Sequence, residues 1–428
     1  MKKITCIFLI FISLTTSGIA KPEKLALTTQ AESAILINAD TGAILYEKNA
    51  HALHYPASIT KIVTAICALE KVGDNLDIML TADQDCIGTI TEEAFRRSNY
   101  TLPAYLLIPD GSHIGIKRGE QLSLRDLLYG LMVASGDDAA NVIAKHVSGT
   151  IPQFVEEMNL FAKRVGCQST TFYNPHGLHH PKQQTTAYDM ALISKEAMKN
   201  PMFREIVGTV RYTRPKTNKQ EPSILIQTNK LQRKGPLYYP KAIGIKTGYY
   251  SLAGSTLVAA AKDGDRTLIA VLLKVENGKD RFIDAKNMFE MAFRQPKVQR
   301  VILKKGPQKF ATELAGASKK IKSYTAQDTT IEYYPAEEPT IKYLLVWNKD
   351  NKLPIAKDQH IGDLVLLLEN GQIHSKVPLL AQEKVTATWW SGTKKSFFGV
   401  AGLIKIGIVI AIGILLYFIA RKRGWFQR

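Results

Sequence analysis

Before residue 295, the pattern of apolar and polar positions predicts a mixture of helices and antiparallel strands. Two apolar runs on either side of Asp40-Thr41-Gly42 predict a β-hairpin over 34–47. A second hairpin is predicted where Ser255–Ala261 and Thr267–Leu273 flank an Asp-Gly turn. Thr81–Gly119 is irregular and polar, which predicts a loop region. Helical spacing of apolar residues predicts helices at 62–70, Leu122–Leu131, Asp138–Val147, Phe154–Val165, Ala187–Met198 and Ile283–Phe293.

After residue 295, short apolar runs predict a small all-β domain over 295–391, following a first domain over 21–294. Asn370-Gly371 is a hairpin signal within it. The predicted strands are Val301–Leu303, Thr330–Tyr333, Ile341–Trp347, Leu364–Leu368, Gln372–Pro378 and Val385–Trp390.

Both ends of the chain carry segments typical of export and anchoring. Residues 1–20 combine a basic start, a short apolar core and a small-x-small site, which predicts a secretory signal peptide. Residues 397–420 are apolar apart from Lys405 and long enough to span a bilayer. An amphipathic surface helix is the alternative, but apolar residues occur all round the segment. The basic tail 421–428 then predicts a cytoplasmic C-terminus and extracytoplasmic domains.

The charge and the cysteine content limit which partners, cofactors and disulfides are expected. The formal net charge of the 428 residues is +18, which suits an anionic cell surface. Nucleic acid is not expected as a partner, because no zinc finger, RNP-like sequence or basic helix is recognisable. No cofactor is expected, and no His/Cys cluster indicates a metal. Cys67 is predicted to be a buried core thiol, whereas Cys86 and Cys167 are candidates for a disulfide.

Ser58 and Lys61 are the first candidate chemical pair. Pro56 and Ala57 precede the serine, so Ser58 is expected to begin the helix with Lys61 one turn later on the same face. A lysine whose pKa is lowered by its surroundings can activate a serine hydroxyl. S-x-x-K alone occurs by chance in many proteins, where it means a capping serine and a surface lysine.

Two further motifs give the pair a context. Ser135-Gly136-Asp137 and Lys246-Thr247-Gly248 follow in the order S-x-x-K, S-x-N-like, K-T-G, which resembles the signature of penicillin-binding proteins and serine β-lactamases. Segments 174–178, 185–191 and 244–259 resemble those of low-molecular-mass D-alanyl-D-alanine carboxypeptidases. The resemblance covers roughly residues 25–295. It implies an α/β transpeptidase or β-lactamase-like domain, with an antiparallel sheet and a helical region, before the all-β domain and the membrane helix.

The resemblance also implies roles for the motif residues. Ser58 would attack the carbonyl between the two D-alanines of a peptidoglycan stem pentapeptide, while Lys61 takes its proton and Ser135 relays a proton to the departing amine. β-Lactam antibiotics, which resemble the dipeptide, are expected to acylate Ser58. Lys246 and Thr247 would bind the terminal carboxylate, and the N–H groups of Ser58 and Tyr249 would form the oxyanion hole. Gly248 and Asp137 are expected to be further substrate-binding residues.

Asp137 departs from the pattern, because the family usually has Asn there. An ionised Asp accepts hydrogen bonds only, and it favours the charged form of Lys61, so we expect an active but retuned site. Asp138 is expected to cap the following helix. His176 is expected to be structural rather than to touch substrate, and Asn229 is a weaker candidate for lining the cleft.

Three alternatives remain open from the sequence. A D,D-endopeptidase would use the same groups on cross-linked peptides. A serine β-lactamase is disfavoured because no Glu-x-x-Leu-Asn segment is recognisable. A wall-binding protein without activity is supported only by Asp137. The favoured interpretation is an exported, membrane-anchored D,D-carboxypeptidase.

Overall fold

The computed structural model describes residues 24–368 and 371–388, and their contacts divide the chain into two compact units. The first unit extends to Pro296 and also includes Tyr334–Glu337; the second contains Lys297–Tyr333 and the described chain from Glu338 onward. Nothing in the sequence pattern predicted that Tyr334–Glu337, which lies within the second part of the chain, belongs to the first unit. Within the first unit, Glu337 forms an ion pair with the buried guanidinium of Arg266 and accepts a 2.7 Å hydrogen bond from Asn38 Nδ2.

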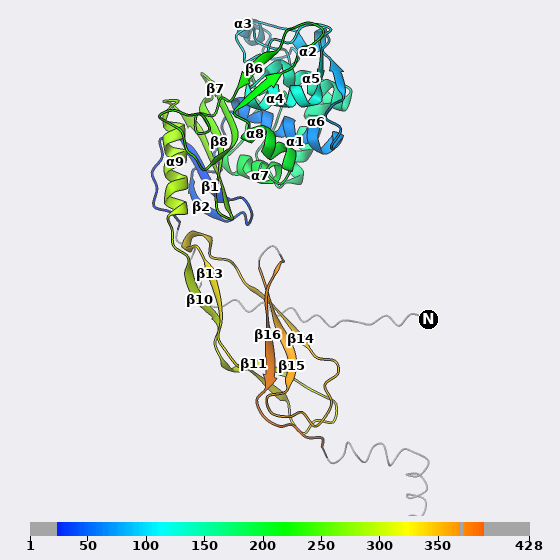
Figure 1. The fold of residues 1–428 in the computed structure, drawn as a ribbon, viewed down its shortest axis with the longest axis vertical. Helices are drawn as coiled ribbons and strands as arrows, with labels where there is room; N and C mark the ends of the chain where they lie inside the picture. Colours follow the sequence, from blue (N-terminus) through cyan, green and yellow to red (C-terminus); the bar gives the residue numbers. More distant parts are fainter. Residues whose placement is uncertain (1–23, 369–370, 389–428) are drawn as a thin grey trace, which may run out of the picture. The chain divides into compact units, whose positions relative to one another are not determined.

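A five-stranded antiparallel sheet lies at the centre of the first unit, in the order β2-β1-β9-β8-β7 (Figure 1). The two predicted hairpins are confirmed as the β1–β2 and β8–β9 pairs. The strand that carries the K-T-G motif, β7, lies at the edge of the sheet. The strands are β1 (Ser33–Asn38), β2 (Ile44–Lys48), β7 (Ala242–Tyr250), β8 (Gly254–Asp263) and β9 (Arg266–Val275).

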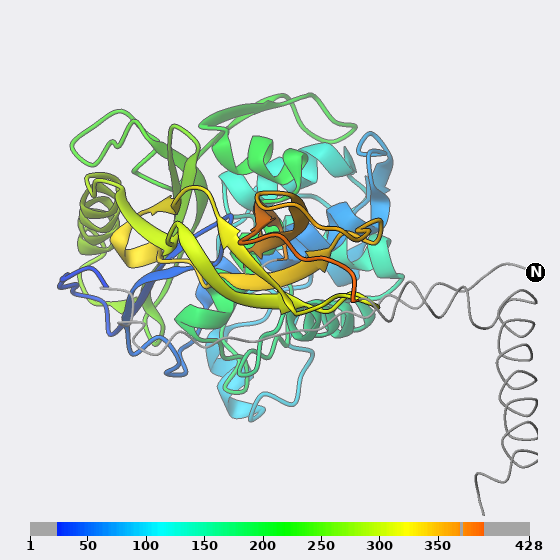
Figure 2. The same cartoon turned by 90° about the horizontal axis from the view of Figure 1, so that it is seen from below.

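Both faces of this sheet are buried. Successive side chains of a strand point to opposite faces. In β1, Ile35 and Ile37 therefore join the core beneath the helical region, while Ala34 and Leu36 join a second core beneath α9 (Asp280–Phe293). Figure 1 and Figure 2 both show α9 on one side of the sheet and the other helices of this unit on the opposite side. This explains why the strands appear in the sequence as nearly continuous apolar runs.

The helical region confirms the predicted helices, with small shifts at their ends. Its longer helices are α1 (Lys61–Val72), α4 (Leu124–Val133), α5 (Asp137–Ser148), α6 (Ile151–Arg164), α7 (Ala187–Ala197) and α8 (Pro201–Gly208), of which α8 was not predicted. Side-chain caps define where most of them begin: the residues that accept a backbone N–H are Ser123, Thr150, Thr186 and Asn200. The two-stranded pairs here are β3 (Met79–Thr81) with β4 (Gln121–Ser123), and β5 (Arg211–Arg214) with β6 (Ser223–Ile226).

The prediction that Thr81–Gly119 is wholly irregular is wrong. The segment contains two short helices, α2 (Gln84–Ile87) and α3 (Glu92–Arg97). Each is stabilised at its start by a side chain, Asp83 for α2 and Thr91 for α3, which accepts backbone N–H groups. Such short helices are held by local caps and neighbours rather than by an apolar stripe, so the hydrophobic pattern does not reveal them.

The second unit is all-β. A core that includes Ile321, Leu364 and Leu379 lies against its five-stranded sheet, which has the order β11-β12-β16-β15-β14. The pattern missed β11 and β12, and at the predicted strand Val385–Trp390 the described residues form isolated bridges instead. The strands are β10 (Val298–Leu303) paired with β13 (Thr329–Tyr333), and β11 (Gly306–Thr312), β12 (Ile321–Thr325), β14 (Lys342–Trp347), β15 (His360–Leu367) and β16 (Ile373–Ala381).

The predicted signal peptide and membrane span lie outside the described residues. Across 24–368 and 371–388, no helix combines the length and apolar character needed to cross a membrane.

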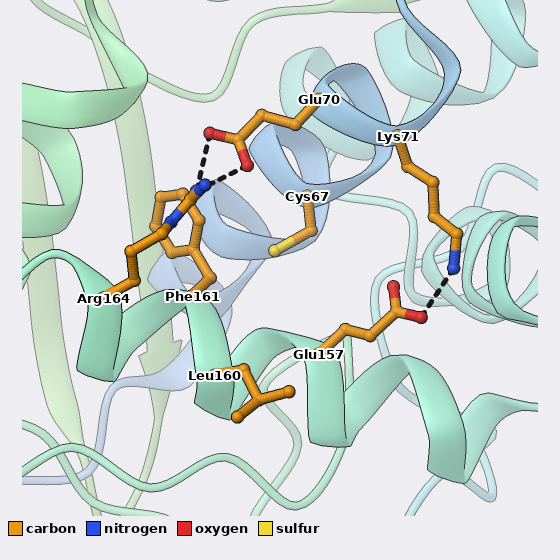
Figure 3. A pocket seen from close by; sticks show the side chains of 7 residues that line it. All are labelled: Cys67, Glu70, Lys71, Glu157, Leu160, Phe161 and Arg164. Atoms are coloured by element: carbon orange, nitrogen blue, oxygen red, sulfur yellow. Dashed lines mark hydrogen bonds and ion pairs between the residues drawn. The ribbon is translucent and has the colours of Figure 1, made fainter.

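The cysteine predictions have mixed outcomes. Cys67 is buried as predicted, with 7% of its surface exposed, and its thiol lines a pocket of about 350 Å³ between α1 and α6 (Figure 3). Ion pairs between Glu70 and Arg164 and between Lys71 and Glu157 lie at its rim. Cys86 and Cys167, the two candidates for a disulfide, are both free thiols in the described chain.

Candidate active site

Ser58 lies in a tight turn directly before α1. The turn is a 3-10 helix, η1 (Ala57–Thr60), so the serine precedes the α-helix instead of beginning it. Two glycines allow close packing around the turn. A Cβ atom on Gly177 would lie 2.1 Å from Ala57 O, and one on Gly248 would lie 2.8 Å from Ser58 N. The N-x-H-G-L and K-T-G segments thus need glycine where their backbones approach the serine.

Lys61 is fully buried and connects the serine to two other segments. Its Nζ lies 2.9 Å from Ser58 Oγ, 2.6 Å from Asp137 Oδ1 and 2.6 Å from the backbone oxygen of His176. A neutral lysine amine has two hydrogens and one lone pair. In that neutral form, donation of both hydrogens to Asp137 and to the His176 carbonyl would leave the lone pair for the Ser58 hydroxyl, which is the arrangement that a general base requires.

Opposing effects act on the pKa of Lys61. Burial lowers the pKa of its ammonium, and this is the larger effect, while the neighbouring carboxylate of Asp137 raises it. Lys246 is also fully buried, and burial together with the charge of Lys61 holds the pKa of Lys246 well below its usual value. Because burial outweighs the effect of Asp137, the pKa of Lys61 is lowered, which favours its use as a base.

Asp137 also fixes the loop on the other side of the site. Its Oδ2 accepts a 3.1 Å hydrogen bond from Ser112 N, and its own N–H donates to Ser112 O at 2.6 Å. Both oxygens therefore face donors, Lys61 on one side and Ser112 on the other. An Asn amide would present its NH₂ group to one of these donors, so the carboxylate at this position fits its surroundings.

The expectation that Asp138 caps α5 is wrong. The N-cap position is Gly136, and no side chain caps it. The Asp138 carboxylate instead accepts backbone N–H groups from the preceding loop, at Ile114, Gly115 and Ile116, at 3.0–3.1 Å. Asp138 is therefore structural, as expected, but it anchors the loop next to Ser112.

Ser135 occupies the turn between α4 and α5. Its side chain is buried, with 5% exposed, and its φ angle of 67° lies in the left-handed region that non-glycine residues rarely adopt. In the described part of the chain, no hydrogen bond joins it to Ser58 or Lys61. The structure therefore brings Ser58 and Asp137 into contact with Lys61, whereas Ser135 is placed in the turn just before Asp137.

The K-T-G strand, β7, packs against the Ser58 turn at Gly248. Lys246 Nζ donates to Thr247 O at 2.9 Å, and the hydroxyls of Thr247 and Thr228 lie 2.7 Å apart. Tyr249, next along β7, is 67% exposed. Asn229 does not line the cleft: it is fully buried, and its Nδ2 donates to Gly244 O at 2.9 Å, which braces the start of the motif.

His176 is structural, as predicted. It is fully buried, and burial lowers the pKa of its imidazole to about 4. Its Nε2 donates to Tyr105 O at 3.2 Å, while Nδ1 accepts from Leu178 N at 3.1 Å. The neutral ring holds the segment whose carbonyl contacts Lys61.

Arg281 is a site residue that the sequence did not reveal. Its Nη1 donates to Gly248 O at 2.7 Å and to Thr256 O at 3.1 Å, and burial lowers the pKa of its guanidinium to about 10. It comes from the first turn of α9, 33 residues after Gly248, and no motif surrounds it. Only the packing of α9 against the sheet brings it to the K-T-G strand.

No group of three or more His, Cys, Asp or Glu side chains within 24–368 and 371–388 has the arrangement of a metal site.

Comparisons with known proteins agree with this geometry. A family profile described as D-alanyl-D-alanine carboxypeptidase matches residues 19–277. The D-alanyl-D-alanine carboxypeptidase DacF of Bacillus subtilis is 32% identical over 401 residues, which cover 90% of this chain and 94% of DacF. The carboxypeptidase DacD of Salmonella typhimurium is 31% identical over 358 residues, which cover 82% of this chain and 85% of DacD.

Solved structures show the same fold. Penicillin-binding protein 5 from Haemophilus influenzae superposes with a TM-score of 0.57 at 28% identity, covering 85% of this chain and all of that one. The Streptomyces K15 DD-transpeptidase superposes with a TM-score of 0.53 at 29% identity, covering 64% of this chain and 99% of that one. The chain therefore belongs to the D-alanyl-D-alanine carboxypeptidase family of low-molecular-mass penicillin-binding proteins.

Proposed function

We propose that this serine-type D-alanyl-D-alanine carboxypeptidase removes the terminal D-alanine of peptidoglycan stem pentapeptides through an acyl-enzyme on Ser58. The observation that carries the proposal is the set of contacts around Lys61. Its buried amine lies 2.9 Å from Ser58 Oγ, and it donates to the Asp137 carboxylate and to the backbone oxygen of His176. This arrangement prepares the serine for nucleophilic attack.

In the acylation step, Lys61 takes the hydroxyl proton while Ser58 Oγ bonds to the carbonyl carbon of the penultimate D-alanine. The C–N bond then breaks, and Ser135 passes a proton to the nitrogen so that D-alanine leaves as an amine. The N–H groups of Ser58 and Tyr249 stabilise the oxyanion. Water then attacks the ester, releases the shortened peptide and restores the Ser58 hydroxyl.

The substrate carboxylate is held by the K-T-G strand. Lys246 supplies the charge and Thr247 a hydroxyl donor, while Gly248 keeps the strand close to Ser58. Arg281 acts as a positioning residue, because it holds the carbonyl of Gly248 and adds positive charge behind the strand. A β-lactam that mimics the dipeptide acylates Ser58 through the same contacts.

Asp137 retunes this site. Its carboxylate raises the pKa of Lys61, against the larger effect of burial, and thereby keeps more of the base in the charged form. We therefore propose an active enzyme that acylates more slowly at low pH than it would with Asn at this position.

We also propose that the protein is exported and anchored. The pattern of residues 1–20 supports a signal peptide, and the apolar segment 397–420 with the basic tail 421–428 supports a membrane span. The catalytic unit would then face peptidoglycan outside the cytoplasm.

Mass spectrometry tests the proposed reaction. The full chain is incubated with a pentapeptide that ends in D-Ala-D-Ala and, separately, with penicillin. We expect loss of one alanine from the peptide and a penicillin adduct on Ser58, with both signals absent in Ser58→Ala. An adduct on another residue, or peptide trimming by Ser58→Ala, would contradict the proposal.

A further inference from the structure

Four aromatic rings form a cluster that joins the segments around Ser58. His179 lies at its centre and directly follows the N-x-H-G-L segment. Its ring centroid lies 4.9 Å from that of Tyr55, 5.4 Å from that of Tyr100 and 5.5 Å from that of Tyr250. All four residues are half-buried, so their rings remain partly accessible. These four residues are the aromatic cluster.

The members of the cluster come from four separate parts of the chain. Tyr55 stands three residues before Ser58, and Tyr250 is the last residue of β7. Tyr100 follows α3, in the segment between β3 and β4. The hydroxyl of Tyr250 lies 3.3 Å from Nδ1 of His179, so a polar contact adds to the ring contacts. The cluster therefore lies next to both the serine turn and the end of the K-T-G strand.

An unusual backbone holds Tyr100 in the cluster. Asn99 and Tyr100 are consecutive, and their φ angles of 50° and 58° lie in the left-handed region that bulky residues rarely adopt. The Tyr100 ring makes edge-to-face contacts with His179 and with His180, and it stacks on the buried ring of Phe95 at 6.2 Å. Strained backbone of this kind persists only where the surrounding contacts fix it, and it concentrates at binding and active sites. The strain therefore points to a binding role for Tyr100.

The position of the cluster along β7 relates it to the substrate. β7 is an edge strand of its sheet, and an extended peptide can lie along such an edge. In the proposed function, Thr247 holds the terminal carboxylate, and the N–H of Tyr249 receives the oxygen of the scissile carbonyl. A strand advances about 3.3 Å per residue, so the rest of the substrate continues beyond Tyr249 toward Tyr250. The aromatic cluster then lies beside the residue that precedes D-Ala-D-Ala in the stem peptide.

The chemistry of the cluster favours a cation. The faces of phenol rings carry partial negative charge and attract ammonium groups, but they do not attract carboxylates. Burial lowers the pKa of the His179 imidazole, so this ring is neutral at neutral pH and adds no positive charge. The rings alone would attract an ammonium group only weakly, because they are partly exposed to water.

A carboxylate near the rings strengthens this preference. The charge of Glu92, in the first turn of α3, opposes the effect of burial on the pKa of His179. Burial, and after it the charge of Glu92, raises the pKa of Tyr100, against a smaller opposing effect of Arg96. Among the described residues Glu92 forms no ion pair, whereas its neighbour Glu93 forms one within α3. The charge of Glu92 is therefore available to a ligand.

We propose that the aromatic cluster, together with Glu92, binds an ammonium group on the side chain of the residue that precedes D-Ala-D-Ala, and thereby selects stem peptides with a cation at that position. The inference rests on the proposed function, because Thr247 and Tyr249 give the direction of the substrate only if they hold its end. Tyr100 and Glu92 are then specificity-determining residues, and the reaction at Ser58 is unchanged.

Two pentapeptides test the proposal on the full chain. Both end in D-Ala-D-Ala, and they differ only at the preceding residue, which is lysine in one and Nε-acetyl-lysine in the other. The acetyl group removes the positive charge and keeps the stem of the side chain. We expect kcat/KM of the unaltered enzyme to be about tenfold higher for the lysine peptide.

Variants identify the residues that carry this selectivity. In Tyr100→Leu, we expect the lysine-to-acetyl-lysine ratio of kcat/KM to fall about fivefold, mainly through KM for the lysine peptide. Tyr100→Phe keeps the ring and is expected to change the ratio less than about twofold. Glu92→Gln is expected to lower the ratio about threefold. Its matched control, Glu93→Gln, removes an exposed charge from the same helix and is expected to leave the ratio unchanged.

The other outcomes separate the two proposals. Equal or lower kcat/KM for the lysine peptide in the unaltered enzyme overturns the assignment of the cluster, while the proposed function stands. A Tyr100→Leu variant that is slower on both peptides, with the ratio intact, also overturns it, because the role of the ring is then structural. So does an equal fall of the ratio in Glu92→Gln and Glu93→Gln. If the unaltered enzyme trims neither peptide, the proposed function itself fails.

Discussion

Replacing Asp137 by Asn perturbs the site at one atom and one charge. The Asp137 carboxylate lies 2.6 Å from Lys61 Nζ, and both groups are buried. In Asp137→Asn, the amide oxygen can still accept from Lys61, but the negative charge is gone and the NH₂ group meets the N–H of Ser112. Since the carboxylate raises the pKa of Lys61, its removal lowers that pKa further and increases the neutral fraction of the base.

The size of the effect follows from titration of Lys61. The acid limb is the low-pH side of the pH profile of kcat/KM, where Lys61 becomes protonated. One pH unit below the midpoint of this limb in the unaltered enzyme, about a tenth of Lys61 is neutral. If Lys61 in Asp137→Asn is wholly neutral at that pH, kcat/KM there rises by about tenfold. The same substitution is expected to lower the free energy of unfolding. The backbone N–H of Ser112, an exposed residue, loses its acceptor at a part-buried position, which costs up to about 1 kcal/mol.

The assay is the pH profile of kcat/KM on a D-Ala-D-Ala peptide, because it reports ionisation in the free enzyme. We expect the acid limb of Asp137→Asn to lie at lower pH, while thermal unfolding occurs at a lower temperature. Asp138→Asn is the matched control. Its carboxylate holds the loop at Ile114–Ile116 and raises the pKa of Lys61 only through its charge, more weakly than Asp137 does, so we expect lower stability with a smaller displacement of the limb.

An acid limb at the same pH in Asp137→Asn and in the unaltered enzyme would refute the reasoning. So would an equal displacement of the limb in Asp138→Asn, since the cause would then be loop disorder rather than the charge beside the base.

Three further changes test the remaining contacts. Gly248→Ala places a Cβ atom 2.8 Å from Ser58 N, so we expect penicillin acylation, followed by mass spectrometry, to slow at least about a hundredfold; a near-normal rate would contradict the packing. Arg281→Gln removes the donor to the Gly248 carbonyl, and we expect kcat/KM to fall about tenfold, with Arg281→Lys recovering part of it in steady-state assays; no loss in the glutamine variant would remove its positioning role. Glu337→Gln leaves the buried Arg266 without its charge partner, and we expect a loss of about 3–5 kcal/mol in the free energy of unfolding, measured by denaturant titration; a loss below about 1 kcal/mol would contradict it.

The sequence by itself determined the elements and the family. Apolar spacing of 3.6 and 2 residues predicted the main helices and both hairpins of the first unit, because those periodicities are set by local backbone geometry. The order of the three motifs singled out Ser58, Lys61 and the K-T-G strand as the candidate site. The structural role of His176 was also anticipated. The sequence did not reveal α2, α3 and α8, since short or locally capped helices leave little periodic signal.

The tertiary structure decided which residues of the site contact one another. The contacts of Lys61 reach 76 residues along the chain to Asp137 and 115 residues to His176. Arg281 meets Gly248 only because α9 packs on the sheet. Asp138 looked like a helix cap, but the adjacent loop supplies its donors. Hydrogen bonds of this kind depend on how distant segments pack and on which buried polar groups need partners, and no local pattern encodes that pairing.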